Sequence, residues 1–340
     1  MSNWRIFYIH KHPAGLCLLL GALTLLAVLA GICIGAAAIS PVEILRVITG
    51  QEAADSGAYR ILVYSRLPRV AAGLLAGSAL AVSGALLQSV LNNPLAAPGI
   101  IGVNAGAGLL VVLSCVVLPA ASWAVPLTAF LGAALGAGLV LGISEAAGAS
   151  RISLVLTGVA VSNICTAGID AAVTFFPEAL NGYSDFRIGG FSSVAASQLR
   201  PAAWVIAAGL LTALSLSRQL EVLSLGRETA QSLGLPVRRT RLILLLTAAA
   251  LAGAAVSFSG LLGFVGLMAP QITRRLVGQG GWAWLLASGL GGGLLVVLCD
   301  LLARTLFRPY ELPVGVVMSL AGGPFFIWLL FRQRGGRTHA

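Results

Sequence analysis

The sequence predicts an all-α membrane protein, a polytopic helical bundle of about ten spans with both termini in the cytoplasm. Hydrophobic residues make up 58% of the chain and charged residues only 9%, whereas a soluble globular domain carries about 25% charged residues. Apolar runs of roughly 20 residues, each long enough to cross the hydrocarbon core of a bilayer, recur along the chain. The alternating ten-residue segments of a membrane β-barrel are absent. We therefore expect a single membrane domain over 1–340, with its bundle at 15–331.

The apolar runs place the individual spans. The first run is too long for the hydrophobic part of a signal peptide and has no convincing cleavage site, so we expect it to be a retained span. The eighth is short and is expected to be partly re-entrant. The expected spans cover residues 15–39, 67–90, 99–118, 124–143, 152–173, 201–217, 241–261, 264–277, 282–306 and 313–331.

The lysines and arginines predict the orientation of the bundle. With both termini inside, the inner side carries a moderate excess of these residues, as the positive-inside rule requires. Two polar segments, 40–65 and 176–199, then lie on the outer, periplasmic side. The second is long enough to form a short helix beside an outer opening.

A charged stretch at Ser217–Arg241 interrupts the apolar pattern. Its helical spacing predicts a short amphipathic helix outside the membrane, and Gly234 followed by Pro236 predicts the end of that helix. The stretch is either a solvated connection that orients its neighbours by charge, or a docking surface for a soluble partner. The residues on the expected face are Val222, Leu225, Gly226, Thr229, Ala230 and Leu233.

Composition and motifs exclude several classes of site. The net charge of +10 follows from the placement of the arginines and does not indicate nucleic-acid binding. The five cysteines lie in apolar segments without a CxxC motif, so we expect buried free thiols and no metal or cofactor site. There is no GxxxxGK[ST] phosphate-binding loop, and the GxSxG and HExxH motifs of hydrolases are also missing. An intramembrane enzyme is therefore not favoured, and the glycine runs are assigned to helix packing.

Three stretches resemble the FecCD-type permeases, the membrane subunits of ABC importers for ferric siderophores, haem and cobalamin. RLPRVAAGLLAGSALAVSGALLQSVLNNPLAAPGIIGVNAGAG at 66–108 is similar to the signature stretch of that family. GLLGFVGLMAPQITRRLVG at 260–278 is similar to its GFVGLxxPHxxR segment, except that Gln271 stands where the family usually has His. The third stretch, 300–330, resembles the last two spans of the family, and 217–241 resembles its cytoplasmic coupling loop.

The resemblance implies a bacterial inner-membrane permease that moves its cargo by alternating access. It implies a second permease chain, identical or not, two cytoplasmic ATPase subunits and a periplasmic or lipid-anchored substrate-binding protein. The expected cargo is a ferric siderophore, with haem or cobalamin as the alternative. A secondary transporter of similar size is the competing class, but inverted repeats and broken central helices with paired charges are not evident.

Three arginines mark the outer side. Arg66 and Arg69 are three residues apart at the outer end of the second span, and Arg304 ends the ninth span on the same side. Long cationic side chains at such positions often extend to the membrane interface. The resemblance implies a second role, in which the arginines form a cationic rim that pairs with carboxylates of the binding protein.

The fifth span carries an unusual number of polar residues. Polar residues in a span usually face protein or water rather than lipid, and the resemblance implies that this helix and its partner line the pathway. The carboxylate of Asp170 is a departure from the family pattern and is costly in hydrocarbon. It therefore either reaches the interface or contacts cargo or the paired helix at the outer gate. The candidate pathway residues are Thr157, Asn163, Thr166 and Asp170.

Two sets of inner residues complete the predicted site. The short connection 144–151 contains Gly148 and Ser150, which form either a simple turn or, as the resemblance implies, an inner gate at a dimer axis. The resemblance also places the ATPase coupling helix in the charged stretch. The candidate coupling residues are Arg227, Glu228, Ala230 and Gly234.

Overall fold

The computed structural model describes residues 13–35, 39–53, 55–119, 121, 123–148, 150–278, 280–307 and 309–334. Every regular element within these ranges is helical, which confirms the all-α class. The elements are α1 Pro13–Cys33, α2 Pro41–Ile48, α3 Gly57–Arg60, the π-helix η1 Ile61–Arg66, α4 Leu67–Leu91, the 3₁₀ helix η2 Pro98–Ile101, α5 Val103–Val117, α6 Ala124–Ala146, α7 Arg151–Phe175, α8 Ala179–Ile188, α9 Ala196–Ser215, α10 Ser217–Ser224, α11 Arg227–Ser232, α12 Val237–Ser259, α13 Val265–Val277, α14 Gly281–Ala303 and α15 Val314–Arg334.

Each of the ten predicted spans contains a helix. In the described part of the chain, six helical stretches are long and apolar enough to cross a membrane, and the bent pair α9–α10 makes a possible seventh. Helix α5 and the apolar part of α15, Val314–Leu329, are shorter, and α13 has 13 residues. Length and composition therefore support six or seven spans. The ten-span count and the side on which the termini lie stay predictions.

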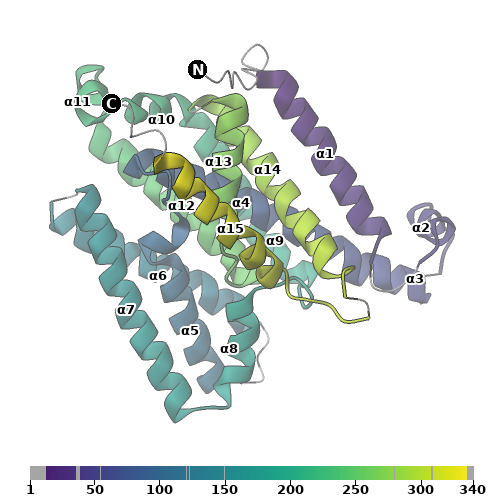
Figure 1. Cartoon of the computed structure of the whole chain (residues 1–340). Helices are drawn as coiled ribbons and strands as arrows, with labels where there is room; N and C mark the ends of the chain where they lie inside the picture. The colour runs from purple at the N-terminus through teal and green to yellow at the C-terminus, as the bar shows by residue number, and fades with distance from the viewer. Residues whose placement is uncertain are drawn as a thin grey trace.

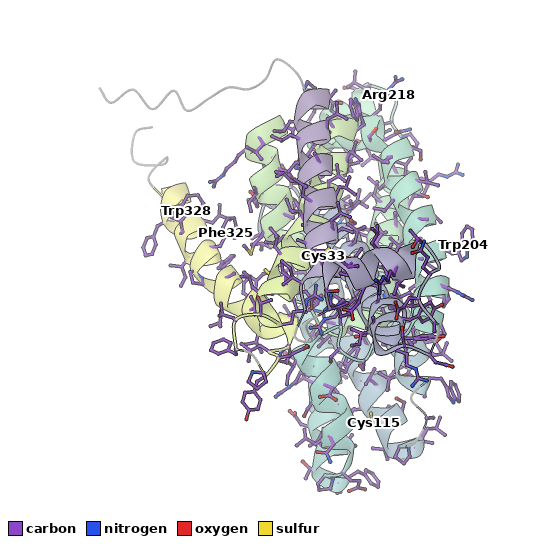
Figure 2. All side chains as sticks on the ribbon, turned by 90° about the vertical axis from the view of Figure 1, so that its right-hand side faces the viewer. Cys33, Cys115, Trp204, Arg218, Phe325 and Trp328 are labelled. Atoms are coloured by element: carbon purple, nitrogen blue, oxygen red, sulfur yellow. The ribbon has the colours of Figure 1, made fainter. Side chains whose placement is uncertain are left out.

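Figure 1 shows the helices running roughly along one common direction. The start of α1, helices α10 and α11 and the end of α15 lie toward one end of the bundle, and α8 lies toward the other. Helices α1 and α7 lie at opposite edges, with α4 and α12 between them. Figure 2, turned by 90°, shows Arg218 at the end where α1 begins, while Cys33 marks the opposite end of α1.

Several predicted boundaries are wrong. Helix α1 ends at Cys33 instead of residue 39, because arginine side chains bind its last carbonyl groups, as described below. The second span begins ten residues earlier than predicted: Gly57–Leu91 is one continuous helical stretch of 35 residues, so part of the outer segment 40–65 is helical. The expected short helix in the outer segment 176–199 is confirmed as α8. Cys33 is exposed, against the expectation for the cysteines.

The predicted single helix in the charged stretch is two helices. Gly226 has φ +109°, a conformation that favours glycine, and it separates α10 from α11. The pair α9–α10 is bent by 56°. The apolar residues therefore do not share one helical face: Leu225 is 60% exposed, whereas Ala230 is fully buried.

Helices α5 and α6 cross through two pairs of glycines. Gly102 lies against Gly136, and Gly106 lies against Gly132, so the two GxxxG segments run in opposite directions. A Cβ atom added at any of the four would collide with backbone atoms of the opposite segment. Lipid provides no hydrophobic drive for helix association, so close contact between helix backbones has to supply the attraction. This arrangement confirms a packing role for these four glycines.

Glycine contacts of the same kind hold α4 at the centre of the bundle. Gly77 of α4 lies against the backbone of Gly292 and Gly293 in α14, and Gly84 lies against Gly266 of α13. Most residues of α4 are buried. The bundle is therefore built around α4, with α12, α13 and α14 packed against it.

The α5–α6 crossing can be tested with two glycines of the same helix. We expect Gly132→Val to lower the free energy of unfolding by about 1–3 kcal/mol or more, since the new side chain overpacks a backbone contact. Gly138→Val is the matched control, because no atom lies within 4 Å of a Cβ at that position. Thermal unfolding in detergent, followed by size-exclusion chromatography, measures both. Equal stability of the two variants would contradict the crossing.

Candidate functional site

Helix α7 presents a polar stripe that the rest of the chain does not cover. One face of the helix packs into the bundle through Leu154, Gly158, Val161, Cys165, Ile169 and Ala172. Asn163, Thr166, Asp170 and Thr174 are exposed, and their spacing of three or four residues puts them on the opposite face. No hydrogen bond or ion pair within the described part of the chain engages the side chain of Asn163 or Asp170. We name these four residues the α7 stripe.

Three of the four predicted pathway residues lie in the α7 stripe, and Thr157 does not. Thr157 precedes Asn163 by six residues, which turns it about 120° around the helix, and it is only partly exposed. The threonines of the stripe bind their own helix: Thr166 Oγ1 donates to the Ser162 carbonyl at 2.9 Å, and Thr174 Oγ1 to that of Asp170 at 2.7 Å. The carboxylate of Asp170 and the amide of Asn163 are therefore the groups left for a ligand or a partner.

Helix α8 places a phenol close to this stripe. A Cβ on Gly108 of α5 would lie 3.2 Å from Ile169 of α7 and 3.4 Å from the hydroxyl of Tyr183 in α8, so these three helices meet there. Burial raises the pKa of the Tyr183 phenol; Arg187 opposes this rise and the Asp170 carboxylate adds to it. Tyr183 therefore stays a neutral hydrogen-bond donor at physiological pH.

The predicted outer arginines lie inside the protein instead of on a rim. Arg66, Arg69 and Arg304 are 3%, 8% and 1% exposed. Arg69 Nε donates to both carboxylate oxygens of Asp300, at 2.9 and 3.2 Å, and Arg69 Nη1 donates to Glu311 at 2.6 Å. Arg304 Nε lies 3.4 Å from Asp300 Oδ2. We name these five residues the outer charge cluster.

The outer charge cluster also ends α1. Arg66 Nη1 donates to the carbonyls of Ile32 and Cys33, both at 2.8 Å, and Arg304 Nη2 donates to that of Gly31 at 2.7 Å. The last carbonyls of a helix lack partners within the helix, and cations near that end also interact favourably with its dipole. Four segments are thereby joined: the end of α1, the start of α4, the end of α14 and the connection before α15. An exposed cationic rim, as the sequence analysis expected, is not what these three side chains form.

Backbone hydrogen bonds join three further segments at the outer end. The amide of Gly190 donates to the Ser259 carbonyl at 2.9 Å, that of Leu261 to Phe186 at 2.9 Å, and that of Gly315 to Gly189 at 3.2 Å. The end of α8, the end of α12 and the start of α15 therefore meet. A cavity of about 390 Å³ lies beside this junction, with Asp185, Gln198 and four serines among its lining residues.

Two of the predicted inner residues, Ser150 and Glu228, line a second cavity. Gly148 has φ +92°, which explains the glycine, and the Ser150 hydroxyl accepts from the Ser153 amide at 2.9 Å as the N-cap of α7. A groove of about 610 Å³ has Ser150, Arg151, Glu228 and Thr229 among its lining residues. Ser150 of the predicted gate and Glu228 of the predicted coupling helix therefore border the same groove, whereas Gly148 is not among its lining residues.

The coupling residues divide into exposed and structural ones. Glu228 is exposed, whereas Ala230 is fully buried and its carbonyl accepts from the Leu235 amide at 3.0 Å. Gly234 has φ +80° and ends this turn as predicted. Arg227 begins α11, but its side chain lies outside the described part of the structure.

Gln271 replaces the expected histidine and has a packing role. Its Nε2 donates to Gln88 Oε1 at 2.8 Å and to the Pro94 carbonyl at 2.9 Å, while Gln88 Nε2 donates to the Gly266 carbonyl at 3.1 Å. These bonds tie the end of α4 to α13. Sequence analysis missed Gln88 and Glu311, because nothing local to either residue indicates a partner about 180 or 240 positions away. Asp300 carried a signal, since it lies four residues before Arg304 on one helix.

The fold and the uncovered polar helix define a helical membrane transport protein. The model of the FecCD transport family matches residues 23–332, and the chain belongs to that family. It is therefore a permease component of an ABC importer and a membrane protein. Within the described residues, no group of three or more His, Cys, Asp or Glu side chains is placed to hold a metal ion.

Relatives in two bacteria and one solved structure support this assignment. The chain is 34% identical over 322 residues to the Fe(3+)-citrate import system permease protein YfmE of Bacillus subtilis, which covers 94% of this chain and 96% of the relative. It is 38% identical over 288 residues to the hemin transport system permease protein HmuU of Yersinia pestis, covering 82% and 86%. A protein described as a metal-chelate type ABC transporter in an inward-facing conformation superposes with a TM-score of 0.82 at 26% identity, covering 94% and 99%.

The outer charge cluster generates a stability prediction. We expect Asp300→Asn to cost about 3–5 kcal/mol, because it leaves Arg69 and Arg304 buried without their shared carboxylate. Glu311→Gln is expected to cost about 1 kcal/mol, since its side chain is 32% exposed and one hydrogen bond is weakened. Glu178→Gln, at an exposed outer position, is the control and is expected to change stability by less than about 0.5 kcal/mol. Thermal unfolding in detergent checks the order, and an unchanged Asp300→Asn variant would rule out the cluster as described.

Proposed function

We propose that this chain is the permease subunit through which an iron chelate crosses the bacterial cytoplasmic membrane, driven by separate ATPase subunits. The observation that carries the proposal is the α7 stripe, which lies opposite the packed face of its helix and is uncovered. A polar helix face is costly against lipid, so a second permease chain covers it. The pathway then runs between the two copies of α7.

A ferric siderophore is the cargo that we propose first, and haem or cobalamin is the alternative. The two bacterial relatives are named for the import of Fe(3+)-citrate and the transport of hemin. The α7 stripe offers the carboxylate of Asp170 and the amide of Asn163, because its two threonine hydroxyls donate to their own helix. This set suits hydrogen bonding to a whole chelate rather than ligation of the iron. Iron is therefore cargo inside its chelator and not a cofactor of this protein.

The proposed partners are a second permease chain, two ATPase subunits on the inner side and a substrate-binding protein on the outer side. Glu228, on the exposed side of α11, contacts an ATPase subunit, while Ala230 and Gly234 hold α11 in place. Gly148 and Ser150 form the inner gate. A carboxylate of the binding protein reaches Arg69 by displacing Glu311, because Glu311 is 32% exposed whereas Asp300 is 3% exposed.

Uptake by reconstituted vesicles tests this function. We expect the complex of this chain with its ATPase and binding protein to take up at least one of radiolabelled ferric citrate, a ferric hydroxamate, hemin or cobalamin only when ATP is supplied. Asp170→Ala is expected to reduce the rate while leaving the complex assembled. Accumulation driven by an ion gradient without the ATPase would instead identify a secondary transporter.

A charge reversal tests the coupling helix. We expect Glu228→Arg to separate ATP hydrolysis from uptake, lowering uptake at least about tenfold, because the variant places a cation where the partner meets an anion. Glu178→Arg makes the same charge change on the outer side and serves as the control. ATP hydrolysis and uptake are measured on the same vesicles. Normal uptake by Glu228→Arg would remove this residue from the docking surface.

A further inference from the structure

The start of α12, which follows the predicted coupling helix α11 in the chain, contacts the segment of the predicted inner gate. Arg238 Nε, in the first turn of α12, donates to Glu145 Oε2 in the last turn of α6 at 2.9 Å. Arg241 Nη2 lies 3.4 Å from the Ser150 carbonyl. The two arginines are three residues apart and lie on one face of α12. Both ends of the connection between α6 and α7 are thus contacted by the same helix turn.

The acceptors of these bonds organise the inner connection itself. The carbonyl of Glu145 accepts from the Gly148 amide at 3.3 Å, and that of Ser150 accepts from the Leu154 amide at 3.2 Å, the first hydrogen bond of α7. Glu145 therefore holds the turn through its backbone and binds Arg238 through its side chain. A displacement of Arg238 and Arg241 acts directly on the turn and on the start of α7.

Helix α11 is closely linked to the start of α12. They are joined by the short segment 233–236, which is closed by the hydrogen bond from the Leu235 amide to the Ala230 carbonyl. Val237 and Thr240, in the first turn of α12, are only 8% and 6% exposed. This turn is therefore packed firmly against the bundle. Toward α7, by contrast, α11 faces the groove of about 610 Å³. Arg238 and Arg241 of α12 therefore contact the α6–α7 connection, which α11 leaves open across the groove.

We propose that Arg238 and Arg241 transmit the movement of α11 to the α6–α7 connection, so that Glu145 is a positioning residue of the inner gate. This inference rests on the proposed function as an ATP-driven permease. It assigns a role to Glu145 and Arg238 that the sequence analysis did not foresee. Because Arg238 is 81% exposed and Glu145 27%, the pair contributes little to folding stability, and its removal leaves the bundle intact.

A charge exchange tests the inference. Arg238→Glu and Glu145→Arg are each expected to lower ATP-driven uptake about fivefold or more, the lower end of ordinary coupling between sites, with ATP hydrolysis within about twofold of the unmodified complex. The double variant Arg238→Glu with Glu145→Arg is expected to restore most of the uptake, since it restores the ion pair in reverse. Arg239→Glu is the matched control, because Arg239 is the neighbouring exposed arginine, and it is expected to transport normally.

A distance measurement gives a second readout that needs no cargo. Spin labels at Ala147 and Leu233, in a chain whose five cysteines are replaced by alanine, report how the inner connection follows the end of α11. We expect Arg238→Glu to broaden the distance distribution and the double variant to narrow it again. Full uptake by the single variants, or defects that the exchange does not repair, would overturn the inference. Absence of ATP-driven uptake in the unmodified complex would instead refute the proposed function.

Discussion

Close backbone contact between helices is the constraint on which this structure depends. Lipid tails are as apolar as the faces of the helices, so no hydrophobic free energy favours helix association in a membrane. The helices therefore have to be held together by van der Waals contact and hydrogen bonds. At the crossings of α5 with α6 and of α4 with α14, glycines bring the backbones so close that no side chain fits between them. Helix α4 thereby becomes a fixed centre, and the elements that bear polar groups are placed relative to it.

The salt bridges of the outer charge cluster are a second interaction that holds the helices together. The outer charge cluster combines three arginines with two carboxylates in a space from which water is largely excluded. Removing one partner from such a cluster leaves a buried charge uncompensated, so its members depend on each other. Because Arg66 and Arg304 also bind the last carbonyls of α1, the cluster fixes α1 against α4 and α14.

Most elements of the proposed pathway and coupling site lie away from these contacts, and Arg69 is the exception because it belongs to the outer charge cluster. Helix α7 packs through one face only, α8 is held at its end by backbone hydrogen bonds, and α11 borders a groove. Elements with few packed contacts open more easily than the core. A permease that alternates between two open states needs such elements around a rigid centre, and the ion pair of Arg238 with Glu145 joins the start of α12 to the end of α6.

Local features of the sequence were enough to determine the all-α class, the approximate position of each long helix, the glycine packing and the family. Apolar runs, glycine spacing and short motifs are properties of neighbouring residues, so they can be recognised without a fold. Helical periodicity likewise places Asn163, Thr166 and Asp170 on one face, whereas Thr157, which was predicted to share that face, lies elsewhere on the helix.

Only the tertiary structure decided which partners each polar side chain has. Arg69 looked like an interfacial residue until its contacts with Asp300 and Glu311 were known, and Gln271 could be understood only beside Gln88. These partners are separated by more than 180 positions in the chain, and a sequence pattern contains no information on which helix ends meet. The break between α10 and α11 at Gly226 could not be predicted from the sequence either. A glycine is compatible with both a continuous helix and a turn, and the surrounding packing selects its backbone conformation.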